Sequence, residues 1–118
     1  MTRVLHVLDH SLPMHSGYTF RTRAILKAQQ AMGFEVRSIT GIRHKAEGPD
    51  VEEADGLLFH RTEGTAAGPA GLREMREIGL FADSIDRLVR DWRPDVLHAH
   101  SPSLCGAAAG RVARRHGI

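Results

Sequence analysis

Short apolar runs alternate with longer amphipathic segments along this chain. The short runs are residues 3–9, 35–40, 57–60 and 96–99, and the first is apolar at adjacent positions, as in strands buried on both faces. Longer segments with apolar side chains at helical spacing are 17–32, 72–92 and 102–116. The alternation predicts an α/β fold with a parallel sheet flanked by helices, in the spatial order 3-2-1-4 when the strands are numbered along the chain.

Glycine and proline mark the expected ends of the helices. Gly33 and Gly117 follow two helical segments, where a left-handed residue ends a helix well. Arg93-Pro94 stops the helix over 72–92, and Gly79 leaves open whether that helix is kinked or split. Ser101-Pro102 supplies an N-cap and a proline at the first helical position, so the last helix is predicted to begin there.

Two connections lack any periodicity. Residues 41–54 are charged and contain glycine and proline, which predicts a loop up to the Asp55-Gly56 turn. Residues 62–71 form a long connection at the carboxyl end of a strand, which is as consistent with a functional segment as with a variable surface.

The chain ends at Ile118, directly after a helix, where the alternation calls for another strand. We therefore expect residues 1–118 to be an incomplete domain. Strand 96–99 would then be an open edge, and unpaired main-chain groups on such an edge favour self-association.

Composition indicates an ordinary globular unit. Hydrophobic residues make up 42% and charged residues 25% of the 118 residues, and no apolar run is long enough to cross a bilayer. The N-terminus lacks the features of a signal peptide, so we expect a cytoplasmic protein. Cys105, the single cysteine, has no internal partner for a disulfide, and we expect a small residue packed in a helix.

Charge narrows the choice of partners. The formal net charge is +2, with arginine the main cation, and aromatic residues are only 5% of the chain. Nucleic-acid binding would need a basic stripe with interleaved aromatics, so it is not expected. Besides the cytoplasm, a second expected location is the inner face of an anionic membrane, which the protein would contact peripherally.

Two polar segments follow predicted strands that should be neighbours. Residues 10–17 follow the first strand and residues 98–102 end the last one, and each segment opens a helix. Two helix N-termini facing one gap favour a phosphate or carboxylate there. Gly17 is the only glycine between Asp9 and Phe20, so the Gly-x-Gly-x-x-Gly of a dinucleotide fold is missing, and so is the P-loop lysine.

Four histidines, His10, His15, His98 and His100, fall near this gap. His98 and His100 share one strand face and could chelate, but a metal site needs three or four ligands, and no further acidic cluster follows, so no metal is expected. His98 is predicted to pack in the sheet. His100, at the end of the strand, is the better candidate for a hydrogen-bond donor or a general acid or base.

The chain resembles the N-terminal domain of family 4 glycosyltransferases of the GT-B fold. The resemblance lies in the first strand, Pro13, Ser16-Gly17, the helix end at residues 32–36 and the segment 93–100, Arg-Pro-Asp-Val-Leu-His-Ala-His. Residues 8–13 and 15–23 are similar, more narrowly, to bacterial exopolysaccharide enzymes associated with the exosortase system.

The resemblance implies a Rossmann-like, acceptor-side domain of a retaining enzyme that moves a sugar from a nucleotide-sugar donor to a glycan or lipid-linked acceptor. It implies a role for His100 beside the reacting sugar, and an approach of the first loop, at Ser16 and Gly17, to the donor phosphates. His15 and Ser101, beside the two helix N-termini, are expected to bind phosphate as well, and neither a metal nor a cofactor is expected. In the family the position of Ser16 is usually glycine. The donor-binding C-terminal domain is not within these residues, so this chain alone is expected to be inactive.

One alternative from another class remains open. A free-standing doubly wound module could bind a small anion or a partner protein without catalysis. A receiver-like module of this kind would need an acidic cluster at the strand ends, where Asp9 is the only obvious carboxylate.

Overall fold

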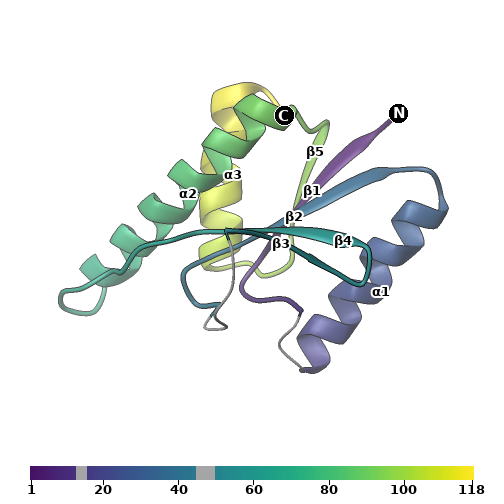
Figure 1. The fold of residues 1–118 in the computed structure, drawn as a ribbon. Coiled ribbons are helices and arrows are strands. Elements are labelled where there is room, and N and C mark those ends of the chain that lie inside the picture. The colour runs from purple at the N-terminus through teal and green to yellow at the C-terminus, as the bar shows by residue number, and fades with distance from the viewer. Residues whose placement is uncertain (13–15, 45–49) are drawn as a thin grey trace.

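A five-stranded sheet forms the centre of the computed structural model, which describes residues 1–12, 16–44 and 50–118. The strands are β1 (Arg3–Leu8), β2 (Glu35–Thr40), β3 (Val51–Ala54), β4 (Leu57–Arg61) and β5 (Val96–Ala99). The helices are α1 (Gly17–Ala31), α2 (Leu72–Trp92) and α3 (Leu104–His116). The strands lie in the order β3-β4-β2-β1-β5 (Figure 1).

The four predicted strands pair as expected. β1 pairs in parallel with β2 on one side and with β5 on the other, and β4 pairs in parallel with β2. The spatial order β4-β2-β1-β5 is the predicted 3-2-1-4, so the prediction of the fold class is confirmed.

The predicted loop over 41–54 is wrong at its end, because β3 lies there and runs antiparallel to β4. The connection is the two-residue turn Asp55-Gly56, in which both residues have positive φ, 54° and 74°. Such a turn matches the twist of a hairpin, so it brings the preceding residues back along β4. β3 has no apolar alternation because it is an edge strand, and its exposure alternates between half-buried and exposed.

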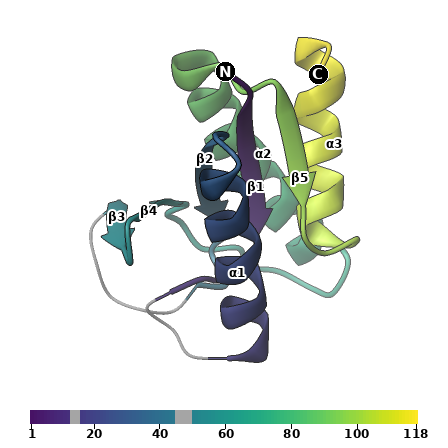
Figure 2. The ribbon, with the colours of Figure 1, turned by 90° about the vertical axis from the view of Figure 1, so that its right-hand side faces the viewer.

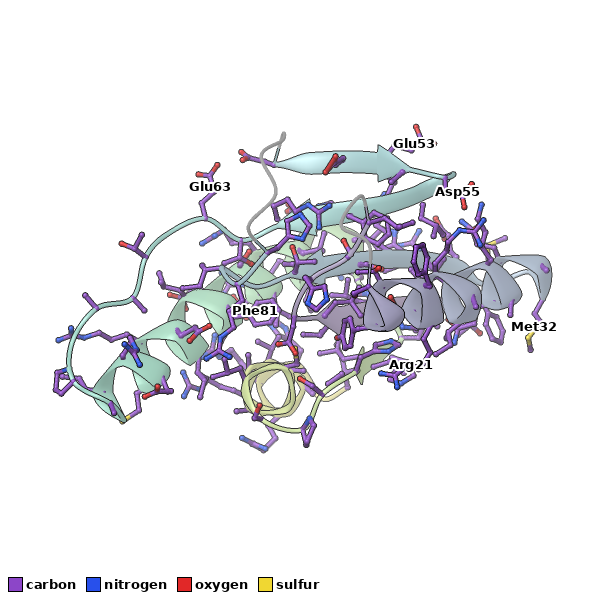
Figure 3. All side chains as sticks on the ribbon, turned by 90° about the horizontal axis from the view of Figure 1, so that it is seen from below. Arg21, Met32, Glu53, Asp55, Glu63 and Phe81 are labelled. Atoms are coloured by element: carbon purple, nitrogen blue, oxygen red, sulfur yellow. The ribbon has the colours of Figure 1, made fainter. Side chains whose placement is uncertain are left out.

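The helices cover the two faces of the sheet in separate layers (Figure 2). Alternation along β1 sends Val4 and Leu8 toward Leu26 of α1, in one apolar cluster. Leu5 and Val7 pack in a second cluster with residues of α2 and α3, which include Phe81 (Figure 3). β1 is therefore buried on both faces, as its continuous apolar pattern predicts.

Three helix ends lie where the sequence predicts them, and the start of one helix does not. α2 is one helix through Gly79, and it ends at Arg93 in the left-handed region with φ 55°. Gly33 and Gly117 also have positive φ, directly after the last turns of α1 and α3. α3 begins at Leu104 rather than at Pro102, because the Ser101 carbonyl accepts from Gly106 N at 3.0 Å and residues 101–103 form a turn first.

Neither α1, α2 nor α3 has the length and apolar content of a membrane span, and these are the helices of the described ranges.

Two glycine substitutions test the hairpin. Gly56→Ala places a side chain at φ +74°, where its Cβ would lie 3.2 Å from Lys27 Nζ, and we expect a loss of about 1 kcal/mol of unfolding free energy. Gly79→Ala adds a Cβ inside a helix, where no heavy atom of the described chain lies within 4 Å, and we expect a gain of about 0.5–1 kcal/mol. Urea denaturation measures both, and equal effects of the two substitutions would contradict the positive-φ turn.

Candidate functional site at the carboxyl ends of β1 and β5

The two predicted polar segments begin side by side. β1 and β5 pair with Val7 opposite Ala99, and His100 N donates to the Val7 carbonyl at 3.1 Å. The start of α1 and the turn between β5 and α3 therefore lie at the same end of the sheet, as Figure 2 shows. In open α/β sheets this is the end at which ligands bind.

The N-terminal end of α1 is built as a capped helix end. Ser16 Oγ accepts from Thr19 N at 3.1 Å, and Thr19 Oγ1 accepts from Ser16 N at 2.9 Å, so the two residues form a capping box. The side chain of Ser16 therefore supports the helix. The amides of Gly17 and Tyr18 precede the first helical hydrogen bond, and the first turn holds no acidic residue, which leaves this end suited to an anion.

The segment after β1 packs on Tyr18. His10 Nε2 lies 3.1 Å from Ser16 Oγ, and the His10 ring lies 4.7 Å from the Tyr18 ring. Asp9 N donates to the Tyr18 hydroxyl at 3.2 Å, and burial raises the pKa of Tyr18 to about 12, so the phenol stays neutral. Arg21 lies over the same ring at 5.7 Å and adds a positive charge to this edge.

A contact between Asp9 and Cys105 joins the first segment to α3. Cys105 Sγ donates to Asp9 Oδ1 at 3.2 Å. Burial raises the pKa of the thiol to about 12, so Cys105 is a neutral donor and not a thiolate nucleophile. Its side chain is fully buried, which confirms the expectation of a packed residue.

His100 belongs to a chain of side-chain hydrogen bonds that the sequence did not predict. His6 Nε2 lies 2.7 Å from Gln29 Oε1, and His6 Nδ1 lies 2.7 Å from His100 Nε2. Because Gln29 Oε1 can only accept, His6 Nε2 donates to it, and the neutral His6 ring then accepts at Nδ1 from His100 Nε2. The tautomer of His100 is thereby assigned, and its Nδ1 remains as an acceptor.

The pKa of His100 is lowered to about 4, mainly by burial and to a smaller extent by the neighbouring His98 and His6. The pKa of His6 also falls to about 4, for the same leading reason. Both rings are therefore neutral near pH 7. This narrows the expected role of His100 to hydrogen bonding or proton acceptance by a neutral imidazole.

The prediction that His98 packs inside the sheet is wrong, because its side chain is exposed on the face that carries α1. α1 lies over β1 and β2 and leaves β5 uncovered (Figure 2). Val96, on the same face of β5, is 45% exposed for the same reason.

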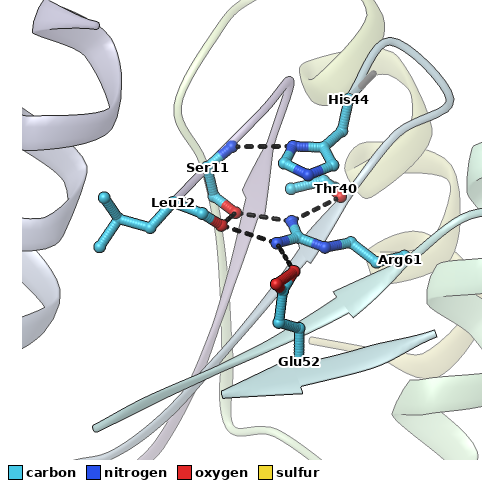
Figure 4. A network of polar contacts seen from close by, with 6 residues as sticks. All are labelled: Ser11, Leu12, Thr40, His44, Glu52 and Arg61. Atoms are coloured by element: carbon cyan, nitrogen blue, oxygen red, sulfur yellow. Dashed lines mark hydrogen bonds and ion pairs between the residues drawn. The ribbon is translucent and has the colours of Figure 1, made fainter. Parts of the chain in front are cut away.

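Arg61 binds the segment after β1 to the neighbouring strands (Figure 4). Its Nη1 donates to Ser11 Oγ at 2.6 Å and to Thr40 Oγ1 at 3.2 Å. Its Nη2 donates to the Leu12 carbonyl at 2.7 Å and pairs with Glu52 Oε1 at 3.0 Å. With only 10% of its side chain exposed, this guanidinium fixes the course of the chain just before the residues that lead into α1.

The predicted site residues are placed as follows. Ser16 and Gly17 lie at the start of α1, and His100 and Ser101 lie just after β5, so all four share one edge of the sheet. His15 lies outside the described residues. A Cβ built on Gly17 meets no heavy atom of the described residues within 4 Å, so these residues leave the space beside this helix end open.

His6 and Arg61 are the main residues that sequence reasoning missed. His6 occupies an otherwise apolar strand and was given no role from the sequence, yet period-two alternation places it on the same face as Val4 and Leu8. Arg61 directly follows the predicted strand 57–60. A cation at the carboxyl end of a strand is the sequence feature that could have marked it as a residue of the site.

A hollow of about 420 Å³ lies further along the same edge of the sheet. It is lined by residues after β2, residues after β4 and the first turns of α2: Ile42, Arg43, Gly64, Thr65, Ala66, Arg73 and Glu77. Arg43 pairs with Glu77 at 2.6 Å, and this contact raises the pKa of the guanidinium. The long connection 62–71 thus contributes to a cavity wall.

Comparison with known families identifies the class of protein. The family described as "Glycosyl transferase 4-like domain" matches residues 16–118, which is most of the chain. This chain therefore belongs to the glycosyl transferase 4-like domain family. No curated protein sequence matches it.

A solved structure supports the fold. Sucrose-phosphate synthase from Thermosynechococcus elongatus is similar with a TM-score of 0.71 and 14% sequence identity. The match covers 98% of this chain and 31% of that protein, so the chain spans about a third of its length. The α/β sheet with flanking helices thus corresponds to part of a GT-B glycosyltransferase.

Substitution of Arg61 tests the role of its network. Arg61→Met leaves Glu52 and the Leu12 carbonyl without their buried partner, and we expect a loss of about 2–4 kcal/mol of unfolding free energy. Arg73→Met removes an exposed pair with Glu74 and is expected to change stability by less than about 0.5 kcal/mol. Equal denaturation midpoints for the two variants would show that Arg61 does not hold this segment.

Acid should weaken the fold before the carboxylates titrate. The pKa values of His6, His44 and His100 are lowered from 6.5 to about 4, so the unfolded chain binds protons at these residues before the folded chain does. Stability is therefore complete above pH 6.5 and falls as the pH drops from 6.5 toward 4. Urea unfolding across this range measures the fall, and His44→Gln should make it shallower. Constant stability over the range would contradict neutral, buried histidines.

Proposed function

We propose that this chain is the acceptor-side domain of a retaining glycosyltransferase, which transfers a sugar from a nucleotide-sugar donor to a glycan or lipid-linked acceptor. The observation that carries the proposal is the shared edge of β1 and β5: the N-terminal end of α1 and His100 lie at the same end of the sheet in a chain of the glycosyl transferase 4-like family. Bacterial exopolysaccharide synthesis is the proposed pathway, on the resemblance of residues 8–23.

The donor diphosphate would lie against the N-terminal end of α1. The amides of Gly17 and Tyr18 can donate to phosphate oxygens there, and the helix dipole favours the negative charge. Ser16 takes part indirectly, since its hydroxyl is used as the cap. Arg21, whose charge acts on both Tyr18 and His100, adds to the attraction.

His100 would lie beside the reacting sugar as a neutral ring. Its Nε2 donates to His6, so the atom left for substrate is Nδ1, which can accept a hydrogen bond from a sugar hydroxyl. His6 and Gln29 are then positioning residues, because they fix the tautomer of His100 and do not touch the substrate themselves.

The acceptor would occupy the hollow between the loops after β2 and β4. Its volume of about 420 Å³ is in the range of small-ligand sites, and Arg43 and Arg73 at its wall suit hydroxyl or phosphate groups. Most donor contacts are assigned to a second, C-terminal domain, so the 118-residue chain alone should bind nucleotide sugars only in the millimolar range and should not turn over.

Two substitutions in the enzyme with its donor-binding domain test this proposal. Gly17→Val adds bulk where none of the described residues lies within 4 Å of the new Cβ, so the fold should be unchanged while the donor KM rises. His100→Ala should lower kcat by about a hundredfold, the usual effect of losing one well-placed hydrogen bond in the transition state.

The matched control for Gly17→Val is Ala24→Val, an exposed position on the same helix, which should leave the donor KM unchanged. Full turnover of His100→Ala, with an unchanged melting temperature, would remove His100 from the mechanism. An unchanged donor KM for Gly17→Val would remove the α1 end from the donor site.

A further inference from the structure

Three histidine rings meet on the α1 face of the sheet, in a cluster of His6, His98 and His100. Ring centroids are 5.1 Å apart for His6 and His98, 5.0 Å for His6 and His100, and 4.3 Å for His98 and His100. One nitrogen from each ring lies within 4.8 Å of the others. Three imidazoles at this spacing are a common donor set for divalent transition metals.

The backbone register creates the cluster. β1 and β5 pair in parallel with His6 directly opposite His98, and alternation places both on the same face. His100 follows two residues later and is held by the hydrogen bond of its N–H to the Val7 carbonyl. Two of the rings are thus carried by paired strands, and the third is carried by the residue directly after β5, whose backbone is bonded to β1, which favours a preorganised site.

Gln29 prepares His6 for ligation. A metal-bound histidine usually donates its second ring N–H to an oxygen, which fixes the tautomer and directs the other nitrogen to the ion. His6 Nε2 donates to Gln29 Oε1 at 2.7 Å, which leaves the lone pair of His6 Nδ1 directed at His100 Nε2. In the absence of metal, the proton of His100 Nε2 occupies this position.

The distances allow an ion with small ring movements. Nitrogens in a tetrahedral zinc site are about 3.3 Å apart, given Zn–N bonds of about 2.0–2.1 Å. The His6–His100 pair would open from 2.7 Å, and His98 would close from at most 4.8 Å. His98 is exposed on the uncovered strand β5, so its ring is free to move and the ion can enter from solvent.

We propose that His6, His98 and His100 form a binding site for a divalent transition-metal ion, with Zn²⁺ as the first candidate and a fourth position open to water. On binding, the proton of His100 Nε2 moves to Nδ1 of the same ring, so the ring stays neutral while Nε2 ligates. No carboxylate belongs to the described cluster, which disfavours Mg²⁺ and Ca²⁺.

The site does not rest on the proposed transferase function, although the two share His100. An ion at His100 Nε2 would reverse the role of Nδ1 from acceptor to donor, so it would interfere with the contact proposed for the sugar. Binding is measured without any activity, and its failure would leave the proposed transfer reaction untouched.

Calorimetric titration of the metal-free 118-residue chain with zinc chloride tests the proposal. We expect one ion per chain with micromolar affinity, and no heat of binding with magnesium chloride. His98→Ala removes an exposed ligand without opening the core, and it should weaken zinc binding by about 10–100-fold. His116→Gln, at the end of α3, is the matched control and should bind zinc as the parent chain does.

Gln29→Leu tests whether the site is preorganised or whether three neighbouring histidines merely chelate the ion. It keeps all three ligands but removes the oxygen that fixes His6, and zinc affinity should fall by about tenfold. Zinc binding that is absent at micromolar concentration, or that is unchanged in His98→Ala, would overturn the proposal. Equal weakening by His116→Gln would overturn it too, since the ion would then bind elsewhere.

Discussion

Parallel pairing of β1 with both β2 and β5 is the constraint on which the rest of the molecule depends. β1 lies between β2 and β5, and its alternating side chains contribute to both apolar clusters, so the helix layers on both faces of the sheet pack against it. The same register sets Val7 opposite Ala99, which brings the segment before α1 and the turn before α3 to one edge. It also sets His6 opposite His98, so the cluster of His6, His98 and His100 follows from the pairing of β1 with β5.

Burial of charge is the second determinant of the site. Arg61 joins the segment after β1 to β2 and to the edge strand β3, and its guanidinium is satisfied only when all of them are in place. A partly satisfied buried cation is costly, so the network favours one arrangement of this segment. The hairpin turn is held to α1 in a similar way, since Arg23 and Lys27 pair with Asp55.

The strand order, the Asp55-Gly56 turn and the end of α2 before Pro94 were predictable, because each follows from a local rule of the backbone or from one run of apolar residues. β3 was not, since an exposed edge strand needs no apolar alternation and its pairing follows from the turn. The exposure of His98 depends on how far α1 extends across the sheet, and the contact of His6 with His100 depends on register. Neither property is encoded in a local pattern.

The central claim is that the carboxyl ends of β1 and β5 form the ligand site. The most direct measurement is a titration of the ¹⁵N-labelled 118-residue chain with a nucleotide diphosphate sugar, followed by amide shifts in NMR spectra, which detect millimolar binding. The account predicts saturable shifts at Gly17, Tyr18 and His100, with none at Gly79. Saturable shifts confined to the opposite end of the sheet, around Arg93 and His116, would contradict it.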